Sequence, residues 1–207
     1  TRTIKLKGRV ALQARSEKAL RLLVAECTND GDVRGVVELD ESITEEQLVP
    51  LAPLMAGGYL AVALLPDVGE RYQGIVPLDG DRIQDCLADY FVRSEQLATG
   101  FWLASDGVRA AGLMLQVLPA EDRDEDVWPR LTAPAHTVQL EELLMLDAET
   151  LLHRLYHEEV VRVFEPESLR FACTCSAERS RDAMVMLGRD ELLKLFAETP
   201  SVDIDCQ

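Results

Sequence analysis

Several features that would place this chain in a familiar class are missing from its sequence. No stretch approaches the ~18 consecutive apolar residues that a membrane-spanning helix needs. The opening residues alternate between polar and apolar side chains, so the apolar core of a signal peptide is not recognisable. The first residue is Thr1 rather than Met, and we therefore expect a fragment or a processed form.

Basic residues are scarce. The chain has 21 Lys and Arg against 37 Asp and Glu, which gives a net charge of −16. The first 40 residues carry +2, so the remainder carries −18, spread over expected helix faces rather than gathered in a tail. This balance argues against binding to nucleic acid or anionic membranes, because both need basic groups to neutralise phosphate. We interpret the acidic residues as a solvated surface that favours solubility.

Catalytic and nucleotide-binding motifs are also lacking. Gly57-Gly58 is typical of a turn, and no glycine loop for phosphate is present. Ser105-Asp106-Gly107 is a turn sequence rather than a nucleophile elbow. His153 and His157 have the spacing of two zinc ligands on a helix, but the glutamate of a His-Glu-x-x-His protease motif is absent. We expect surface or interface histidines, and a protein that is not an enzyme.

What is present is a globular α+β pattern. The chain is 47% hydrophobic and 5% aromatic, enough to build a core in one large domain or two small ones. Period-two alternation and short apolar runs predict strands at 4–12, 20–28, 33–39, 59–65 and 71–77, and a hairpin of 101–104 with 112–118. Helical spacing predicts helices at 83–94, 140–146, 148–159 and 190–198, and a capping box at 44–47 predicts a short helix that ends near Pro50 or Pro53.

The composition changes near residue 120. A charge run at 121–126 is followed by Pro129 and Pro134, and helical patterns dominate beyond them. We therefore expect a domain boundary close to residue 120.

The chain has five cysteines, and two of them look structural. Cys27 falls in an expected strand and Cys86 on the apolar side of an expected helix. Cysteine outside disulfides behaves as a small hydrophobe, so we expect both side chains to be buried.

The remaining cysteines carry the only chemical signal. Cys173 and Cys175 can face the same side of an extended strand, where a mutual disulfide would be strained but one soft metal ion could be shared. Arg179 and Arg181 are close enough in sequence to favour thiolates, and Cys206 supplies a third thiol. Tetrahedral zinc needs four ligands. Spacing alone leaves zinc binding, metal-free redox chemistry and no function as open alternatives.

Five blocks of this sequence form a recognisable set, at 69–76, 89–97, 113–119, 154–159 and 171–176. They include Tyr90-Phe91-x-Arg93-Ser94-Glu95-Gln96 and Cys173-Thr174-Cys175. Together the blocks resemble the redox-regulated 33 kDa chaperonin family of bacterial heat-shock holdases, and they follow that family's order along nearly the whole chain. The resemblance implies a sheet-rich core with packed helices at 1–119, a helical linker at 120–170 and a small zinc module at 171–207. The family's N-terminal helical segment is not recognisable here.

The resemblance also assigns the cysteines. The family binds one zinc ion through a Cys-x-Cys…Cys-x-x-Cys set, and Cys173 and Cys175 match the first pair. Cys206 matches the first member of the second pair, whose partner is expected two residues past Gln207. The same three cysteines are expected to form the redox-active disulfides. Ser180 stands where the family often has a further cysteine that is not a ligand.

The mechanism implied is a switch rather than catalysis. In the reduced, zinc-bound state the protein would be inactive. Oxidation to disulfides would release zinc, unfold the small module and its linker, and expose apolar surface that holds unfolding client proteins without ATP. The family also implies a homodimer in the active state and a cytoplasmic location.

Two other functions fit the sequence less well. A thiol-disulfide oxidoreductase would favour Cys-x-x-Cys at a helix N-terminus within a βαβ unit, whereas this chain has Cys-x-Cys. A zinc-bearing nucleic-acid module is opposed by the net charge of −16.

Overall fold

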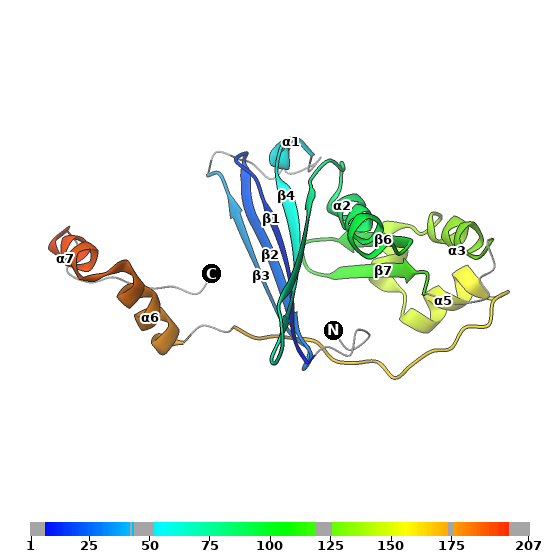
Figure 1. Ribbon diagram of the computed structural model, residues 1–207. Coiled ribbons are helices and arrows are strands. Elements are labelled where there is room, and N and C mark those ends of the chain that lie inside the picture. The colour runs from blue at the N-terminus through cyan, green and yellow to red at the C-terminus, as the bar shows by residue number, and fades with distance from the viewer. Residues whose placement is uncertain (1–6, 42, 44–51, 119–125, 174–175, 199–207) are drawn as a thin grey trace.

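The computed structural model describes residues 7–41, 43, 52–118, 126–173 and 176–198, and its architecture is α+β (Figure 1). A six-stranded sheet and a separate two-stranded hairpin are joined by helices. The strands are β1 (Gly8–Arg15), β2 (Leu20–Thr28), β3 (Asp32–Leu39), β4 (Tyr59–Pro66), β5 (Tyr72–Pro77), β6 (Thr99–Ser105), β7 (Ala110–Gln116) and β8 (Arg170–Phe171). The helices are α1 (Ala52–Met55), α2 (Ile83–Tyr90), the π-helical turn η2 (Phe91–Glu95), α3 (Val127–Ala135), α4 (Leu140–Met145), α5 (Ala148–Tyr156), α6 (Ala177–Leu187) and α7 (Arg189–Glu198).

The large sheet has the order β5-β4-β1-β2-β3-β8. Its first five strands pair antiparallel, and β8 adds to β3 in parallel. The turn between β2 and β3 contains Gly31 in a left-handed conformation (φ 82°), which glycine adopts without steric cost. The amide oxygen of Asn29 in the same turn accepts a hydrogen bond from the N–H of Gly8 at 3.2 Å. This contact ties the turn to the start of β1.

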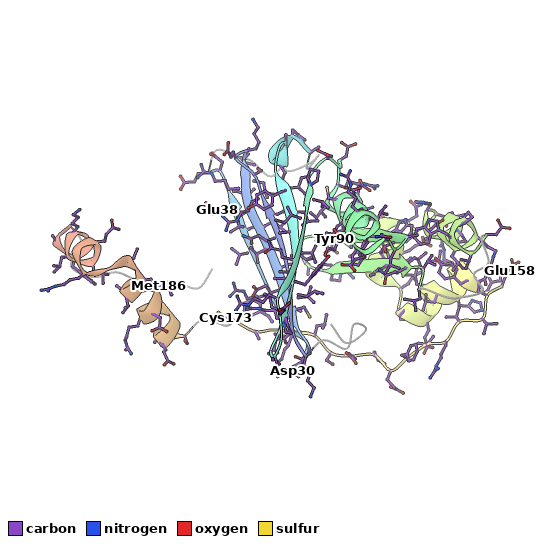
Figure 2. The ribbon with its side chains drawn as sticks, in the orientation of Figure 1. Asp30, Glu38, Tyr90, Glu158, Cys173 and Met186 are labelled. Carbon is purple, nitrogen blue, oxygen red and sulfur yellow. The ribbon has the colours of Figure 1, made fainter. Side chains whose placement is uncertain are left out.

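Helix α2 packs against β4 and β5 on one face of the large sheet, and the main core lies between them. Alternation along the strands places Leu60 and Val62 of β4 and Val76 of β5 on this face, and all three are buried. Helix α2 contributes Leu87 and Tyr90 to the same cluster. In Figure 2, Tyr90 reaches from α2 towards the sheet.

The Tyr90 ring fits only because β5 has a glycine beneath it. A Cβ on Gly74 would lie 2.6 Å from Cε2 and 3.0 Å from the hydroxyl oxygen of Tyr90. The chain then leaves α2 through η2 and ends that turn at Gln96, which has a left-handed conformation (φ 54°). Phe91 of η2 contacts Phe101 of β6, with ring centroids 5.7 Å apart. This sequence of contacts fixes the hairpin beside α2.

The structure confirms every strand region predicted from the sequence within its described residues, with shifts of a few residues at the ends. The strand predicted at 4–12 is β1, which begins at Gly8 and extends to Arg15. The helix predicted at 83–94 is confirmed, but its last turn differs in type, since the α-helix stops at Tyr90 and the chain continues as the π-helical η2. The capping box at 44–47 and the boundary near 120 lie outside the described residues.

Four elements were not predicted: α3, α6, the short β8, and α1, which begins at Ala52 where the predicted short helix ends. Helix α3 contains Pro129 and Pro134, which we read as signs of a break. Pro129 lies in the first turn, where an N–H has no intrahelical partner to lose, and Pro134 lies in the last turn. The hydroxyl of Thr132 donates to the carbonyl of Trp128 at 2.8 Å and satisfies one acceptor of this short helix. Within the described ranges, no helix has the length and apolar character needed to cross a membrane.

Replacing Gly74 with alanine tests the contact beneath Tyr90. Gly74→Ala is expected to lower the free energy of unfolding by about 1–3 kcal/mol, because the added methyl group overpacks the core against the ring. The matched control is Gly35→Ala on β3, where the nearest atom to a new Cβ is the Val24 carbonyl oxygen at 3.4 Å. Urea denaturation measures both variants, and equal midpoints for the two would contradict the packing described here.

Candidate functional site

The β6–β7 hairpin has two apolar faces, and different parts of the chain cover them. Phe101 lies on the face that meets α2 and the main core. Trp102 and Ala104 lie on the opposite face, paired across the hairpin with Leu113 and Ala111. These four side chains belong to a second core cluster that includes residues of α3, α4 and α5. The three helices therefore cover a face that would otherwise meet solvent.

Helices α4 and α5 are short, with six and nine residues. Isolated helices of fewer than ~12–15 residues are marginal in water, so packing must hold these two. Leu143, Leu151 and Leu155 are buried in the second cluster. The Tyr156 hydroxyl donates to the carbonyl of Leu131 at 3.0 Å, which joins α5 to α3. Burial also raises the pKa of Tyr156 above its ordinary value.

Polar contacts complete this group of helices. Arg154 of α5 pairs with Glu142 of α4 (Nε to Oε1, 2.6 Å), and Arg130 of α3 pairs with Glu159 beyond α5. Asp147 caps α5 by accepting a hydrogen bond from the N–H of Thr150 at 2.9 Å.

That hydrogen bond lowers the pKa of the Asp147 carboxyl, with a further contribution from the hydroxyl of Thr150. Because the pKa is lower in the folded protein than in the unfolded chain, the cap contributes its full stability at pH values above the ordinary pKa of an aspartate. That contribution is lost as the pH falls through the lowered pKa of the folded protein.

Both tryptophans of the chain lie where these helices meet the hairpin. Trp102 of β6 and Trp128 of α3 line one cavity of about 400 Å³, together with residues of α2. The Trp102 ring also contacts His136 edge to face, with centroids 5.2 Å apart. Intrinsic fluorescence therefore reports directly on whether α3 is packed against the hairpin.

Residues 157–169 follow α5 without regular secondary structure and lead back to the large sheet (Figure 1). Many of their apolar side chains are exposed to solvent, and so is that of Phe171 in β8. The exposed residues within this segment are Val160, Val161, Val163, Phe164 and Leu169. A run of exposed apolar residues in one segment is a feature of interaction surfaces.

This segment is anchored on the turn before β3. The N–H of Arg170 donates to the carbonyl of Gly31 and the N–H of Ala172 to that of Val33, both at 3.0 Å. The Arg170 guanidinium pairs with Asp32 (Nε to Oδ1, 2.5 Å), and this partner raises the pKa of Arg170. A Cβ on Gly31 would lie 2.6 Å from the carbonyl oxygen of Ser168, so the turn needs glycine for this close approach as well.

Cys173 follows this anchor directly. Its side chain is exposed, and Figure 2 shows it at the end of the large sheet near the β2–β3 turn. Cys175 and Cys206 lie outside the described residues, as does the side chain of Arg179, so their predicted association with Cys173 stays a prediction. In the described part of the chain, no three His, Cys, Asp or Glu side chains lie together as a metal site. Arg181 is exposed on α6.

The two cysteines predicted to be structural differ from each other. Cys86 is 2% exposed, and burial raises the pKa of its thiol. Cys27 is only half-buried, so the prediction for it is wrong in degree. Helix α2 contacts β4 and β5, and Cys27 of β2 is not among the residues of the main core. His153 and His157 are both exposed with ring centroids 6.1 Å apart, as expected for surface histidines.

Comparison with known proteins gives a consistent result. The family model described as Hsp33 protein matches residues 1–207. The chain belongs to the Hsp33 family. It is 50% identical to the 33 kDa chaperonin of Pseudomonas fluorescens strain SBW25, over 99% of this chain and 70% of the relative. It is 48% identical to that of Pseudomonas aeruginosa strain LESB58, over 99% of this chain and 71% of the relative.

A solved Hsp33 structure supports the fold. The crystal structure of the 33 kDa chaperonin from Thermotoga maritima matches with a TM-score of 0.75 and 23% identity, over 93% of this chain and 69% of that one. The predicted α+β fold with a sheet-rich core and packed helices is thus confirmed, whereas the zinc module stays a prediction. The names of the Hsp33 relatives support a chaperone.

The sequence of this Hsp33 chain did not reveal that the segment leading to Cys173 is anchored on the turn between β2 and β3. The residues Asn29-Asp30-Gly31-Asp32 were recognised only as a turn. Their partner, Arg170, is 138 residues away, and a single sequence contains no signal for such pairing. The role of Tyr156 was equally hidden, because its hydroxyl bonds to a backbone carbonyl.

The contrast between Cys86 and Cys173 predicts selective thiol reactivity. After removal of any bound metal with a chelator, iodoacetamide at neutral pH should modify Cys86 about 100-fold more slowly than Cys173, because burial disfavours the Cys86 thiolate and blocks access. Peptide mass spectrometry measures both rates. In urea the two should converge, and equal rates in the folded protein would refute the buried position of Cys86.

The Tyr156 hydrogen bond predicts a selective loosening of α5. Tyr156→Phe removes this donor from the carbonyl of the half-buried Leu131, at a cost of about 1–2 kcal/mol. Amide exchange in α5 should then rise by about five- to thirtyfold. Tyr59→Phe on β4 is the matched control, since Tyr59 is exposed. Unchanged exchange in α5, or an equal rise in the control, would show that this hydrogen bond does not hold the helices.

Proposed function

We propose that this protein is a redox-regulated, ATP-independent holdase that binds unfolding proteins under oxidative and heat stress. One observation carries the proposal: short helices cover an apolar hairpin face, and the same chain continues from them into the Cys173 segment. A chemical change at the thiols can therefore act on the apolar surface through the connecting chain. The lack of a phosphate-binding glycine loop supports independence from ATP.

The proposed sensor is the thiol group of Cys173, Cys175 and Cys206. Thiolates are soft donors that suit zinc, so the donor chemistry fits that metal, and Cys173 is exposed enough to take part. When bound, zinc would supply about 10–16 kcal/mol of folding free energy to a module too small to fold on its core alone. Each disulfide formed removes two thiolate ligands and passes two electrons to the oxidant, such as hypochlorite reduced to chloride.

The proposed response is the release of the linker region, about residues 120–170. Once the thiol segment loses its folded structure, β8 and residues 157–169 lose their anchor on the C-terminal side. Helices α4 and α5 are too short to persist alone, so their separation from the hairpin would expose Trp102 and Leu113 to clients. The net charge of −16 would keep the client complex dispersed, and we expect the active state to be a homodimer.

The deciding experiment follows client aggregation by light scattering with the full-length protein. Suppression is expected only after oxidation with hypochlorite, accompanied by zinc release and a red shift of tryptophan fluorescence. Cys173→Ser should remove the dependence on the oxidant, because one thiolate of the proposed sensor is lost. Cys27→Ser is the control and should behave like the parent protein.

The other outcomes separate the alternatives. Equal suppression in reduced and oxidised protein would leave a chaperone without a redox switch. No suppression in either state, together with catalytic turnover of a small disulfide substrate, would replace the proposal with a thiol-disulfide oxidoreductase.

A further inference from the structure

The outer edge of β3 is only partly occupied. Strand β8 pairs with Asp32 and Val33, and no other described strand lies beside the rest of β3. Since β8 bonds to the carbonyl of Val33, and backbone groups alternate in direction along a strand, the N–H and C=O groups of Gly35 and Val37 point outward as well. They form a row of hydrogen-bonding groups in the register that β8 begins.

From Gly35 to Leu39 this edge has little that blocks strand addition. These residues include no proline and no lysine, and Glu38 is the one charged residue among them. The opposite edge of the same sheet is different, since β5 ends at Pro77, which has no N–H, and α2 packs against this strand. The sheet therefore has one protected edge and one edge open to pairing.

Two apolar side chains of the open edge are accessible to solvent. Val37 is 55% exposed and Leu39 is 37% exposed. Strand β8 shows that the edge accepts an extended segment, and it is held there by only two residue pairs and an ion pair whose Arg170 side chain is largely exposed. An occupant of the remaining edge would need the same extended form, with apolar side chains at alternate positions.

We propose that the outer edge of β3, from Gly35 to Leu39, binds an extended apolar segment of an unfolded polypeptide as an added strand. The inference rests on the proposed chaperone function and names the surface that the client meets. Main-chain hydrogen bonds would provide affinity for clients of unrelated sequence, because every polypeptide has the same backbone groups. Because β8 takes the Val33 end of this edge, its release on oxidation would lengthen the site in the direction of Gly31.

A lysine on the edge tests the proposal. Val37→Lys places a charge beside the proposed added strand, and the oxidised variant should need about fivefold more protein than the parent to halve aggregation of a heat-denatured reporter enzyme. The matched control is Ile75→Lys on the protected edge, where Ile75 is 61% exposed. The control loses a similar apolar side chain, gains the same charge and should stay within about twofold of the parent.

Hydrogen–deuterium exchange gives a second measurement that needs no variant. In the oxidised parent protein, bound client should protect the amides of β3 and leave those of β5 unchanged. Equal potency of the two lysine variants, or β3 amides that client does not protect, would overturn the proposal for the edge. If the oxidised parent protein itself fails to suppress aggregation, the chaperone function fails first, so the two results are distinguishable.

Discussion

The packing of short helices against one face of the β6–β7 hairpin is the interaction on which the other features depend. Two strands cannot form a core alone, so the hairpin uses α2 on one side and α3, α4 and α5 on the other. The dependence is mutual, because α4 and α5 are too short to be stable without the apolar face of Trp102, Ala104 and Leu113. A surface held in this way is either covered by ordered helices or exposed beside disordered ones, and few intermediate arrangements are stable.

The chain runs from these helices to Cys173, and the attachments at the two ends of this connection differ in strength. At one end, Leu151, Leu155 and Tyr156 are buried, and each such side chain contributes about 1.5–3 kcal/mol when removed from water. At the other end, β8 has two residue pairs with β3 and an ion pair in solvent. The anchor is thus the weaker of the two attachments. Disturbance at the thiols would detach β8 first and reach the helices afterwards, so we infer that opening proceeds from the cysteines towards the hairpin.

The sequence predicted those parts of the fold that local patterns determine. Alternation and short apolar runs located β1 to β7, and helical spacing located α2, α4, α5 and α7. Local patterns failed for α3, where proline tolerance depends on the position of Pro129 and Pro134 within the helix. They failed equally for the pair of Arg170 and Asp32, which only the three-dimensional fold brings together. For the candidate site, spacing and family resemblance indicated the cysteines, but the surfaces that respond to them follow from which face each helix covers.

The two surfaces proposed to bind clients, the hairpin face and the β3 edge, share one physical property. Neither depends on the amino-acid sequence of the client. The hairpin face offers non-directional apolar contact, and the β3 edge offers backbone hydrogen bonds that any extended chain can complete. A holdase must accept many unfolding proteins and keep the complexes dispersed, and a specific pocket would defeat the first requirement. The charge of −16 serves the second, since repulsion between complexes opposes the association that open edges and apolar faces would otherwise promote. The hairpin face would be an aggregation hazard in a permanently open protein, which gives a physical reason for the short helices that cover it in this structure.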